Sequence, residues 1–352
     1  MRVSCTDPES PLLLNGRYRL LEAAGRGGMA EIHRAEVMRG GATGEIVAVK
    51  RILPDLAGDP ESHQMFEDEA RMTAMFRHPN IVRFEDYGRD VEGPYLVLEW
   101  VDGGSARELV SSAFKPFEPE GAASIALDVL RALMVLHHGR AQGARVSRLP
   151  VIHRDVSLSN VLVTTHGDAK LADFGLARSL AHPRTQPPGT ARGKLGYLPP
   201  EVLAGGPHGV RGDLYSVGCL FWEALTARSM FAELPTRDRL RALAGSRRPP
   251  IRSVRPDVSP ELARVIDGAL SFDAADRPGN AEVMSHALLD ALGPAGVALG
   301  NAAVARRVAD VSRRNAEKRR SITPAVSDAE VANLLASTMR AIGQTTTVAL
   351  GA

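Results

Sequence analysis

The chain has 352 residues, of which 44% are hydrophobic, so it can bury a substantial core in one large two-lobed domain or in two ordinary ones. Its formal net charge of +2 gives no reason to expect a nucleic-acid or membrane-surface partner. The two cysteines, Cys5 and Cys219, fit a reducing cytoplasm better than a disulfide framework or a zinc site, and without a signal peptide or eighteen consecutive apolar residues we expect no membrane span.

The first part of the chain is rich in strand-like runs. Glycines separate these runs, which indicates hairpins, and one segment rich in helix formers lies among them. In chain order we expect a flexible leader at 1–17, strands at 18–25, 30–37 and 45–53, a helix at 61–76, and strands at 81–88 and 95–101.

The second part is dominated by a helical pattern up to about residue 290, interrupted by loops at 139–160 and 173–211. A β-rich part before an α-rich part predicts an α+β fold with a small N-lobe at 18–101 and a larger C-lobe at 102–292. The tail at 293–352 contains a basic amphipathic stretch followed by small polar residues, so we expect it to be partly helical and partly disordered.

A glycine-rich turn lies between the first two expected strands. Small residues allow backbone N–H groups to close over triphosphate oxygens without obstruction by side chains. A glycine-rich hairpin alone is more often an ordinary turn, and here an alanine stands where the usual third glycine would be. The candidate phosphate-binding residues are Gly25, Arg26, Gly27, Gly28, Met29 and Ala30.

Lys50 ends the third expected strand, in the run Val-Ala-Val-Lys. Only five of the 43 basic residues are lysines, which favours a specific role for this ammonium over a place at a strand end on the surface. A lysine that contacts the α and β phosphates needs a carboxylate to hold it. The spacing favours Glu69 on the following helix, with Glu67 and Asp68 as alternatives.

The strongest signal is His153-Arg154-Asp155 with Asn160 following, and Asp173-Phe174-Gly175 eighteen residues after Asp155. A carboxylate can orient an incoming hydroxyl and accept its proton, and carboxylate and amide oxygens suit a hard cation such as Mg²⁺. Either triplet alone occurs by chance, but both in this order, after the glycine-rich turn and Lys50, indicate phosphoryl transfer.

Together these motifs resemble the eukaryotic-type (Hanks-type) serine/threonine protein kinases, especially their bacterial branch, over about residues 18–290. The resemblance implies one bilobal domain at 18–292 that binds ATP with Mg²⁺, or with Mn²⁺ as an alternative, and acts on protein substrates. It implies Asp155 as catalytic base, an ion pair of Lys50 with Glu69, and Asn160 and Asp173 as metal ligands.

The resemblance also assigns residues around the nucleotide and in the supporting structure. Glu201 is expected to pair with Arg277, and Asp213 to support the catalytic loop. The implied nucleotide contacts are the loop from Gly25 to Ala30, the gatekeeper Leu98, the hinge residues Glu99 and Val101, Asp102 near the ribose, and Ile32, Ala48 and Leu162.

The sequence departs from the family pattern at two linked positions. Ser157 replaces the lysine that usually follows the catalytic aspartate by two residues, and Lys194 stands where a threonine is usual. We hypothesise that Lys194 supplies the missing cation; a surface lysine beside a weak site is the alternative. Arg154 can bind a phosphate on the activation segment, and Thr190 is the favoured site of autophosphorylation, ahead of Ser179 and Thr185.

The sequence therefore predicts a cytoplasmic serine/threonine protein kinase. Ala30 and Ser157 motivate the alternative of a pseudokinase that binds ATP or acts as a scaffold. A small-molecule kinase is disfavoured by the long activation segment ending in Pro200-Glu201, and tyrosine specificity stays open because of Ser157.

Overall fold

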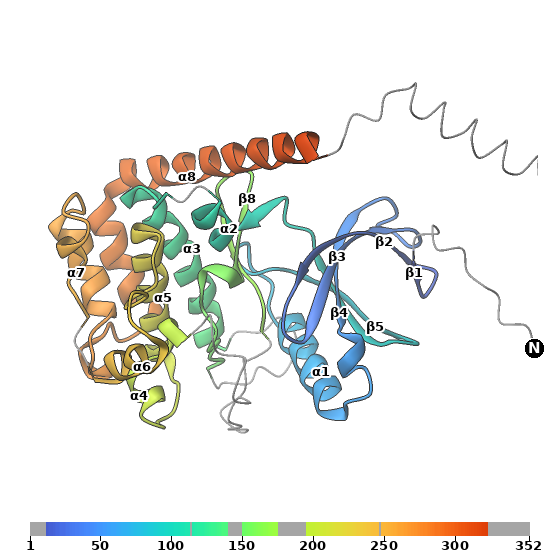
Figure 1. Cartoon of the computed structure of the whole chain (residues 1–352), viewed down its shortest axis with the longest axis horizontal. Helices are drawn as coiled ribbons and strands as arrows, with labels where there is room; N and C mark the ends of the chain where they lie inside the picture. Colours follow the sequence, from blue (N-terminus) through green and yellow to red (C-terminus); the bar gives the residue numbers. More distant parts are fainter. Residues whose placement is uncertain (1–11, 113–114, 140–149, 175–194, 246–247, 323–352) are drawn as a thin grey trace, which may run out of the picture. The chain divides into compact units, whose positions relative to one another are not determined.

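The computed structural model describes residues 12–112, 115–139, 150–174, 195–245 and 248–322. One compact unit of the chain ends at Ala309, and a second begins at Asp310. The order of elements agrees with the predicted α+β class, since strands dominate before residue 100 and helices after it (Figure 1).

The N-lobe contains a six-stranded antiparallel sheet of order β1-β2-β3-β4-β6-β5 (Figure 1). The glycine-containing turns that separate the expected strands are the turns of antiparallel hairpins. The strands are β1 (Leu13–Leu14), β2 (Tyr18–Arg26), β3 (Ala30–Val37), β4 (Ile46–Ile52), β5 (Phe84–Asp90) and β6 (Gly93–Glu99).

The two-residue period of β4 (Ile46–Ile52) sends its side chains to opposite faces of the sheet. Val47 and Val49 enter one buried cluster, whereas Ile52 packs with Phe66 of helix α1 (Pro60–Ala74) on the other face. Asp59 caps α1 by accepting a hydrogen bond from the Ser62 backbone N–H at 2.9 Å. Helix α1 therefore lies on the sheet face that also carries Lys50.

Part of the segment predicted as a leader is ordered. Strand β1 pairs with β2, placing Leu14 opposite Tyr18, and Leu14 is buried in the first sheet cluster. The leader boundary at 17 was therefore too late, because a two-residue strand is too short to give a periodic signal. Residues 1–11 lie outside the described part of the chain.

The C-lobe is built around helix α5 (Val210–Thr226), in which every residue from Gly212 to Leu225 is buried. Short 3₁₀ segments precede helices at Leu195–Tyr197, Ile251–Ser253 and Ala274–Asp276. Others lie before β8 at Leu158–Asn160 and in the N-lobe at Pro54–Leu56. The other helices are α2 (Ala106–Ser111), α3 (Pro119–His137), α4 (Pro200–Leu203), α6 (Thr236–Gly245), α7 (Pro260–Ala269) and α8 (Ala281–Ile322).

A small second sheet of order β7-β8-β9 carries the segments on either side of the catalytic motifs. Its strands are β7 (Gly103–Ser105), β8 (Val161–Thr164) and β9 (Ala169–Leu171). Strand β8 starts directly after Asn160, and β9 ends two residues before Asp173. The β8–β9 hairpin therefore sets the relative position of these two residues.

Helix α8 bends at Gly293, which has a φ of +63° and precedes Pro294. The helix continues beyond this bend, and its residues up to Ala309 belong to the same compact unit as the rest of the C-lobe. The boundary expected at 292 coincides with the bend but not with the end of the compact unit.

One helix in the described ranges, Ala281–Glu317, is long and apolar enough to cross a membrane when judged by length and composition. No such segment was expected, because the sequence contains no run of eighteen consecutive apolar residues. The mean hydropathy of the apolar stretch of this helix is nevertheless high, because few charged residues lie there among alanine, valine and leucine.

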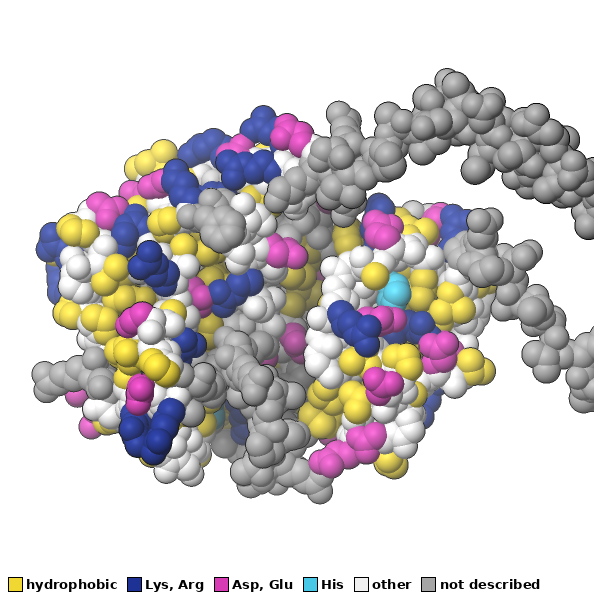
Figure 2. Space-filling view, in the orientation of Figure 1, with side chains coloured by type: hydrophobic (Ala, Val, Ile, Leu, Met, Phe, Trp, Pro, Cys, Tyr) yellow, Lys and Arg dark blue, Asp and Glu magenta, His cyan; other side chains and the backbone are white. Residues whose placement is uncertain are grey.

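On the face shown in Figure 2, Lys and Arg side chains are interspersed with Asp and Glu over both lobes, in keeping with the small net charge.

Candidate active site

The Lys50 ammonium lies between two carboxylates contributed by different parts of the fold. Its Nζ is 2.5 Å from Glu69 Oε1 on α1 and 3.2 Å from Asp173 Oδ1 after β9. Burial by itself would lower the pKa of Lys50, but the charges of Asp173 and Glu69 outweigh it and hold the pKa above its usual value. Lys50 is therefore positively charged at neutral pH and connects β4, α1 and the start of the Asp173 segment.

Among the three acidic candidates on α1, only Glu69 is buried and contacts Lys50. Glu67 instead pairs with Arg89 and Arg71, and Asp68 accepts hydrogen bonds from Gln64 and Arg71. The choice of Glu69 from its spacing thus agrees with the geometry.

Asp155 and Asn160 are joined within the catalytic loop. The Asn160 amide nitrogen donates to Asp155 Oδ2 and to the Asp155 backbone oxygen, each at 2.8 Å. The Ala172 N–H donates to the Asn160 backbone oxygen at 2.8 Å, which links this loop to the residue directly before Asp173. Asp155 and Asn160 are therefore hydrogen-bonded to each other, and Asp173 directly follows Ala172, the backbone partner of Asn160.

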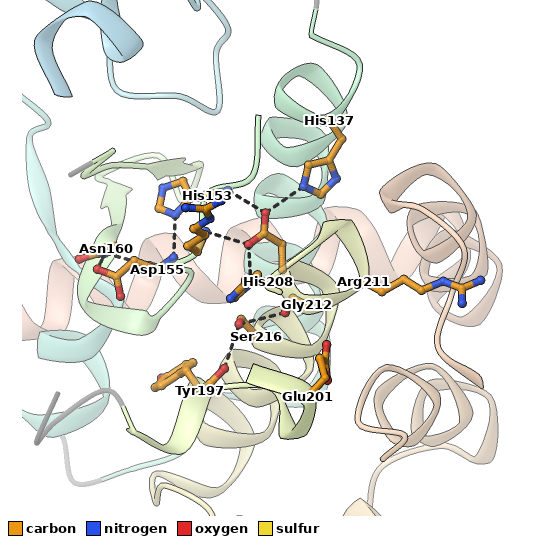
Figure 3. Close-up of polar contacts among 12 residues, drawn as sticks. His137, His153, Asp155, Asn160, Tyr197, Glu201, His208, Arg211, Gly212 and Ser216 are labelled. Carbon is orange, nitrogen blue, oxygen red and sulfur yellow. Dashed lines mark hydrogen bonds and ion pairs between the residues drawn. The ribbon is translucent and has the colours of Figure 1, made fainter. Parts of the chain in front are cut away.

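Asp213 of α5 supports the catalytic loop from inside the C-lobe, and its side chain is fully buried. It accepts hydrogen bonds from the backbone N–H groups of His153 at 2.8 Å and Arg154 at 2.9 Å. Its two oxygens also contact His137 Nε2 at 2.9 Å and His208 Nε2 at 3.1 Å, and these two rings approach it from different sides (Figure 3).

Burial alone would raise the pKa of Asp213, but the hydrogen bonds from His137 and His208 outweigh it and hold the pKa well below its ordinary value. The sequence predicted the role of Asp213 but not the two histidines. His137 is the last residue of α3, and no local pattern indicated His208. A methyl group on Gly212 would lie 2.6 Å from the His208 ring, so Gly212 makes room for this contact.

Two residues of the site have positive φ angles, Arg154 at +65° and Asp173 at +66°. Such angles are costly for residues other than glycine and persist where the surroundings enforce them. The Phe174 ring, which is 1% exposed, provides part of that restraint. It lies 5.3 Å from the His153 ring and 6.3 Å from the Phe76 ring, measured between centroids.

The glycine-rich turn closes with a hydrogen bond from Gly27 N–H to Ala30 O at 2.8 Å. A methyl group added at Gly25 would meet no atom within 4 Å, so the space on this side of the turn is open. Ala30 is buried in the cluster between the sheet and α1, where it packs with Ile52 and Phe66. The departure from the third glycine therefore places a methyl group in the core and does not obstruct the phosphate-binding side.

The residues expected around adenine come from the sheets of both lobes. Ala48 pairs with Leu98 across β4 and β6, and Leu162 of β8 pairs with Ser105. The backbone N–H and C=O groups of Val101 make no hydrogen bond to any described residue, so both can bind a base. The apolar side chains expected here are partly buried at Ala48, Leu98 and Leu162, whereas Ile32 is exposed.

The oxygen ligands available at this site fit a hard divalent cation that also binds phosphate. Asn160 and Asp173 supply amide and carboxylate oxygens, the type of ligand that Mg²⁺ binds together with nucleotide phosphates and water. Within the described residues there is no group of three or more His, Cys, Asp or Glu side chains that could hold a metal ion unaided.

The closing ion pair of the activation segment is present. Glu201 of α4 forms a bidentate contact with Arg277, at 2.8 Å and 2.7 Å, and Arg277 is almost fully buried. Gly175, Lys194 and the candidate phosphorylation sites Ser179, Thr185 and Thr190 lie outside the described residues. Ser157, by contrast, is described, and its buried hydroxyl has no hydrogen-bond partner among the described residues.

Comparison with known proteins identifies a protein kinase domain at residues 18–289. Among similar curated proteins, the chain is 36% identical over 78% of its length to the probable serine/threonine-protein kinase SCO3848 of Streptomyces coelicolor, covering 40% of that protein. It is 32% identical over 78% of its length to the tyrosine-protein kinase MasK of Myxococcus xanthus, covering 42% of it. It is 35% identical over 80% of its length to the serine/threonine-protein kinase PknB of Mycolicibacterium smegmatis, covering 44% of it.

The chain thus spans less than half of the length of these three relatives. The matched region nevertheless includes both lobes and every described residue of the site. Its fold, its motifs and the geometry of the site agree with that match, and the family uses ATP with a divalent metal ion. The chain therefore belongs to the eukaryotic-type protein kinases, in their bacterial branch.

Proposed function

We propose that this protein transfers the γ-phosphate of ATP to serine or threonine hydroxyls of other proteins, with Mg²⁺ as the metal. The observation that carries the proposal is the position of Lys50 Nζ, 2.5 Å from Glu69 and 3.2 Å from Asp173. This contact requires α1 and the Asp173 segment to lie in the arrangement that phosphoryl transfer needs.

In this reaction the substrate hydroxyl oxygen forms a bond to the γ-phosphorus, and the bond from that phosphorus to the β,γ-bridging oxygen breaks. Asp155 orients the hydroxyl and accepts its proton on a carboxylate oxygen. Asn160 holds that carboxylate by donating to Oδ2. The Lys50 ammonium positions the α and β phosphates, and Val101 offers backbone groups to adenine. A divalent cation held by Asn160 and Asp173 would neutralise charge on the phosphates.

The test is transfer of labelled phosphate from ATP to a generic protein substrate with Mg²⁺. We expect the wild type to label the substrate and Asp155→Asn to lose at least about 100-fold in kcat while still binding ATP. Nucleotide binding without transfer by the wild type would favour the pseudokinase alternative. The buried position of Ala30 removes one of the two reasons for that alternative.

Tyrosine as the acceptor is the second candidate, because Ser157 replaces a lysine typical of serine/threonine kinases and one similar protein is named a tyrosine-protein kinase. Phosphoamino-acid analysis of the labelled substrate separates the two. Phosphoserine and phosphothreonine are the expected products, and phosphotyrosine alone would overturn the serine/threonine assignment.

We further propose that Lys194 supplies the cation missing at Ser157. The buried Ser157 hydroxyl, with no partner among the described residues, supports a chemical difference at this point of the loop. We expect Lys194→Met to lower kcat by roughly 100-fold, as for loss of one charge-stabilising group. In that background Ser157→Lys should restore much of the rate. Unchanged kcat in Lys194→Met would remove this proposal.

We place the protein in the cytoplasm, where ATP is available. Helix residues between Pro294 and Ala309 pack on α3 of the C-lobe, which supports a docked helix and not a membrane span. Cell fractionation tests this proposal. Recovery of the full chain in an alkali-resistant membrane pellet would instead assign Ala281–Glu317 to the bilayer.

A further inference from the structure

The part of α8 between Pro294 and Ala309 lies beyond the matched kinase domain, which ends at residue 289. In this segment, hereafter the brace helix, Gly296, Gly300, Val304 and Val308 are buried. Their spacing of four places them on one face of the helix. That face packs against α3, and the adjoining residues Asn301 and Ala305 meet the β8–β9 turn. Figure 1 shows α8 passing beside α3 and β8.

Gly300 brings the brace helix into backbone contact with α3. A methyl group at this position would lie 2.4 Å from Glu120 O and 2.9 Å from Ser124 Cβ, distances that real Cβ atoms do not tolerate. The neighbouring Asn301 accepts a hydrogen bond from the Ser124 hydroxyl. The brace helix and α3 are therefore in close contact at this point, with no room for a side chain on Gly300.

The same turn of the brace helix also contacts the β8–β9 hairpin. Gly167 lies in the hairpin turn with a φ of +92°, and a methyl group there would be 2.3 Å from Asn301 O and 3.0 Å from Ala305 N. The hairpin turn thus rests directly on the helix backbone. At the opposite end of the hairpin are Asn160 and Asp173.

Arg307 holds the other end of the brace helix. Its guanidinium donates to the backbone oxygens of Lys115 at 2.8 Å and Pro116 at 3.0 Å, and it lies 4.8 Å from the centroid of the Phe117 ring. Because it binds carbonyl groups in the segment before α3, this arginine acts together with Gly300 to fix the helix at two points.

We propose that the brace helix positions Asn160 and Asp173 through the β8–β9 turn, with Gly300 and Arg307 as positioning residues. This inference rests on the proposed function, in which these two residues hold a divalent cation. Mg²⁺ demands near-ideal ligand geometry, so a small displacement of the hairpin weakens binding. Detachment of the brace helix would therefore reduce the affinity for Mg²⁺ and nucleotide while the C-lobe core stays folded.

The experiment compares Gly300→Ala with Gly268→Ala in the full chain. Gly268 is also inside a helix, α7, but an added methyl group there meets nothing within 4 Å. Hydrogen exchange is measured without ligand. In Gly300→Ala, the backbone amides of residues 161–171 and of 294–309 should exchange at least about threefold faster than in the wild type. The Mg²⁺ concentration for half-maximal binding of a fluorescent ATP analogue should rise about tenfold, as for loss of an outer-shell support. Gly268→Ala should leave both the amide exchange rates and the Mg²⁺ concentration for half-maximal binding unchanged.

Faster exchange in 294–309 alone, with unchanged exchange in 161–171 and unchanged Mg²⁺ dependence, would overturn the proposal. Should Gly300→Ala fail to fold, Arg307→Met serves instead, because it removes both carbonyl contacts while keeping an apolar stem over Phe117. The exchange measurement needs no turnover. Faster exchange in 161–171 in a chain that transfers no phosphate would support the brace and contradict the proposed function.

Discussion

Lys50 is the single residue on which the most parts of the site converge. Its side chain is 15% exposed and contacts one carboxylate in each of two segments. We expect Lys50→Met to lower kcat/KM at least about 100-fold, because the phosphates lose a preorganised cation. Lys50→Arg should not restore the rate, since a planar guanidinium does not fit a place shaped for a compact ammonium.

The matched control for this prediction is Lys115→Met. The Lys115 side chain is 65% exposed and forms a surface pair with Glu118 at 3.6 Å. In steady-state kinetics with varied ATP, Lys115→Met should have the same kcat/KM as the wild type. Equal losses in the two variants would mean that the effect at Lys50 is not local to the phosphates.

Asp213 allows a prediction about pH. Its folded-state pKa is depressed, so its stabilising contribution is complete above its unfolded pKa of about 3.9 and is lost as the pH falls through the lower folded value. Asp213→Asn should therefore cost about 3 kcal/mol of unfolding free energy at pH 7, and the difference from the wild type should shrink below about pH 4.

Urea unfolding of both proteins between pH 3 and 8 measures this difference. His208→Val in the same series should retain part of the stabilisation, because Asp213 keeps its contacts to His137 and to two backbone N–H groups. A constant difference between wild type and Asp213→Asn down to pH 3 would show that the carboxylate charge is not the cause.

At this scale the sequence predicted the residues whose chemistry is fixed by the reaction. Lys50, Asp155, Asn160 and Asp173 were found because phosphoryl transfer needs those functional groups in that order. The role of His208 was not predicted. Its partner, Asp213, is 5 residues away in the chain, but the two side chains meet only because of how the α4–α5 connection folds. The contribution of His208 depends on Gly212 being small, and no local pattern expresses that dependence.

At the scale of elements, helix α4 is joined to the C-lobe by an ion pair between Glu201 and Arg277. Glu201 is half-buried and forms two hydrogen bonds to Arg277, whose other partners are backbone oxygens of Ser271, Phe272 and Arg211. Burial would raise the pKa of Glu201, but the Arg277 hydrogen bond outweighs it and lowers the pKa. The pair is therefore ionised at neutral pH.

We expect Glu201→Gln to reduce the unfolding free energy by about 2–3 kcal/mol, because it leaves a buried guanidinium without its counter-charge. The carbonyl partners that remain keep the loss below that of a fully isolated charge. Thermal unfolding measures the effect, with Glu261→Gln as control, since Glu261 forms an exposed pair with Arg264. A Tm unchanged from the wild type would contradict this account of α4.

Most elements were predictable because their residues repeat with the period of a strand or a helix. The hairpins at β2–β3 and the helix α1 agree with the expected ranges within two or three residues. Helix in the tail was expected from its amphipathic stretch, but its continuity with the helix before Gly293 was not, because Gly-Pro is a typical end of a helix. Its packing depends on glycines in two other segments, Gly167 and Gly121, which only the tertiary structure brings together.

At the scale of the whole kinase domain, the two lobes are joined behind the nucleotide site as well as through Lys50. The segment before β5 pairs with β9, since Leu171 N–H donates to Asn80 O at 2.8 Å and Val82 N–H donates to Leu171 O at 3.0 Å. Beside them, Lys170 of β9 contacts Glu99 at the end of β6 at 2.9 Å. Both members of this pair are mostly buried, at 19% and 14% side-chain exposure.

The Lys170–Glu99 pair should therefore couple the hinge to the strand that leads into Asp173. A double-mutant cycle of Lys170→Met and Glu99→Gln is expected to give a coupling of about 1 kcal/mol, above that of an exposed pair. Because the pair touches the hinge and not the reacting groups, KM for ATP should rise about threefold in Lys170→Met with kcat nearly unchanged. The same cycle on the exposed Lys115 and Glu118 should give almost no coupling. If the two cycles gave equal values, or if Lys170→Met lowered kcat and left KM unchanged, the pair would not act through the hinge.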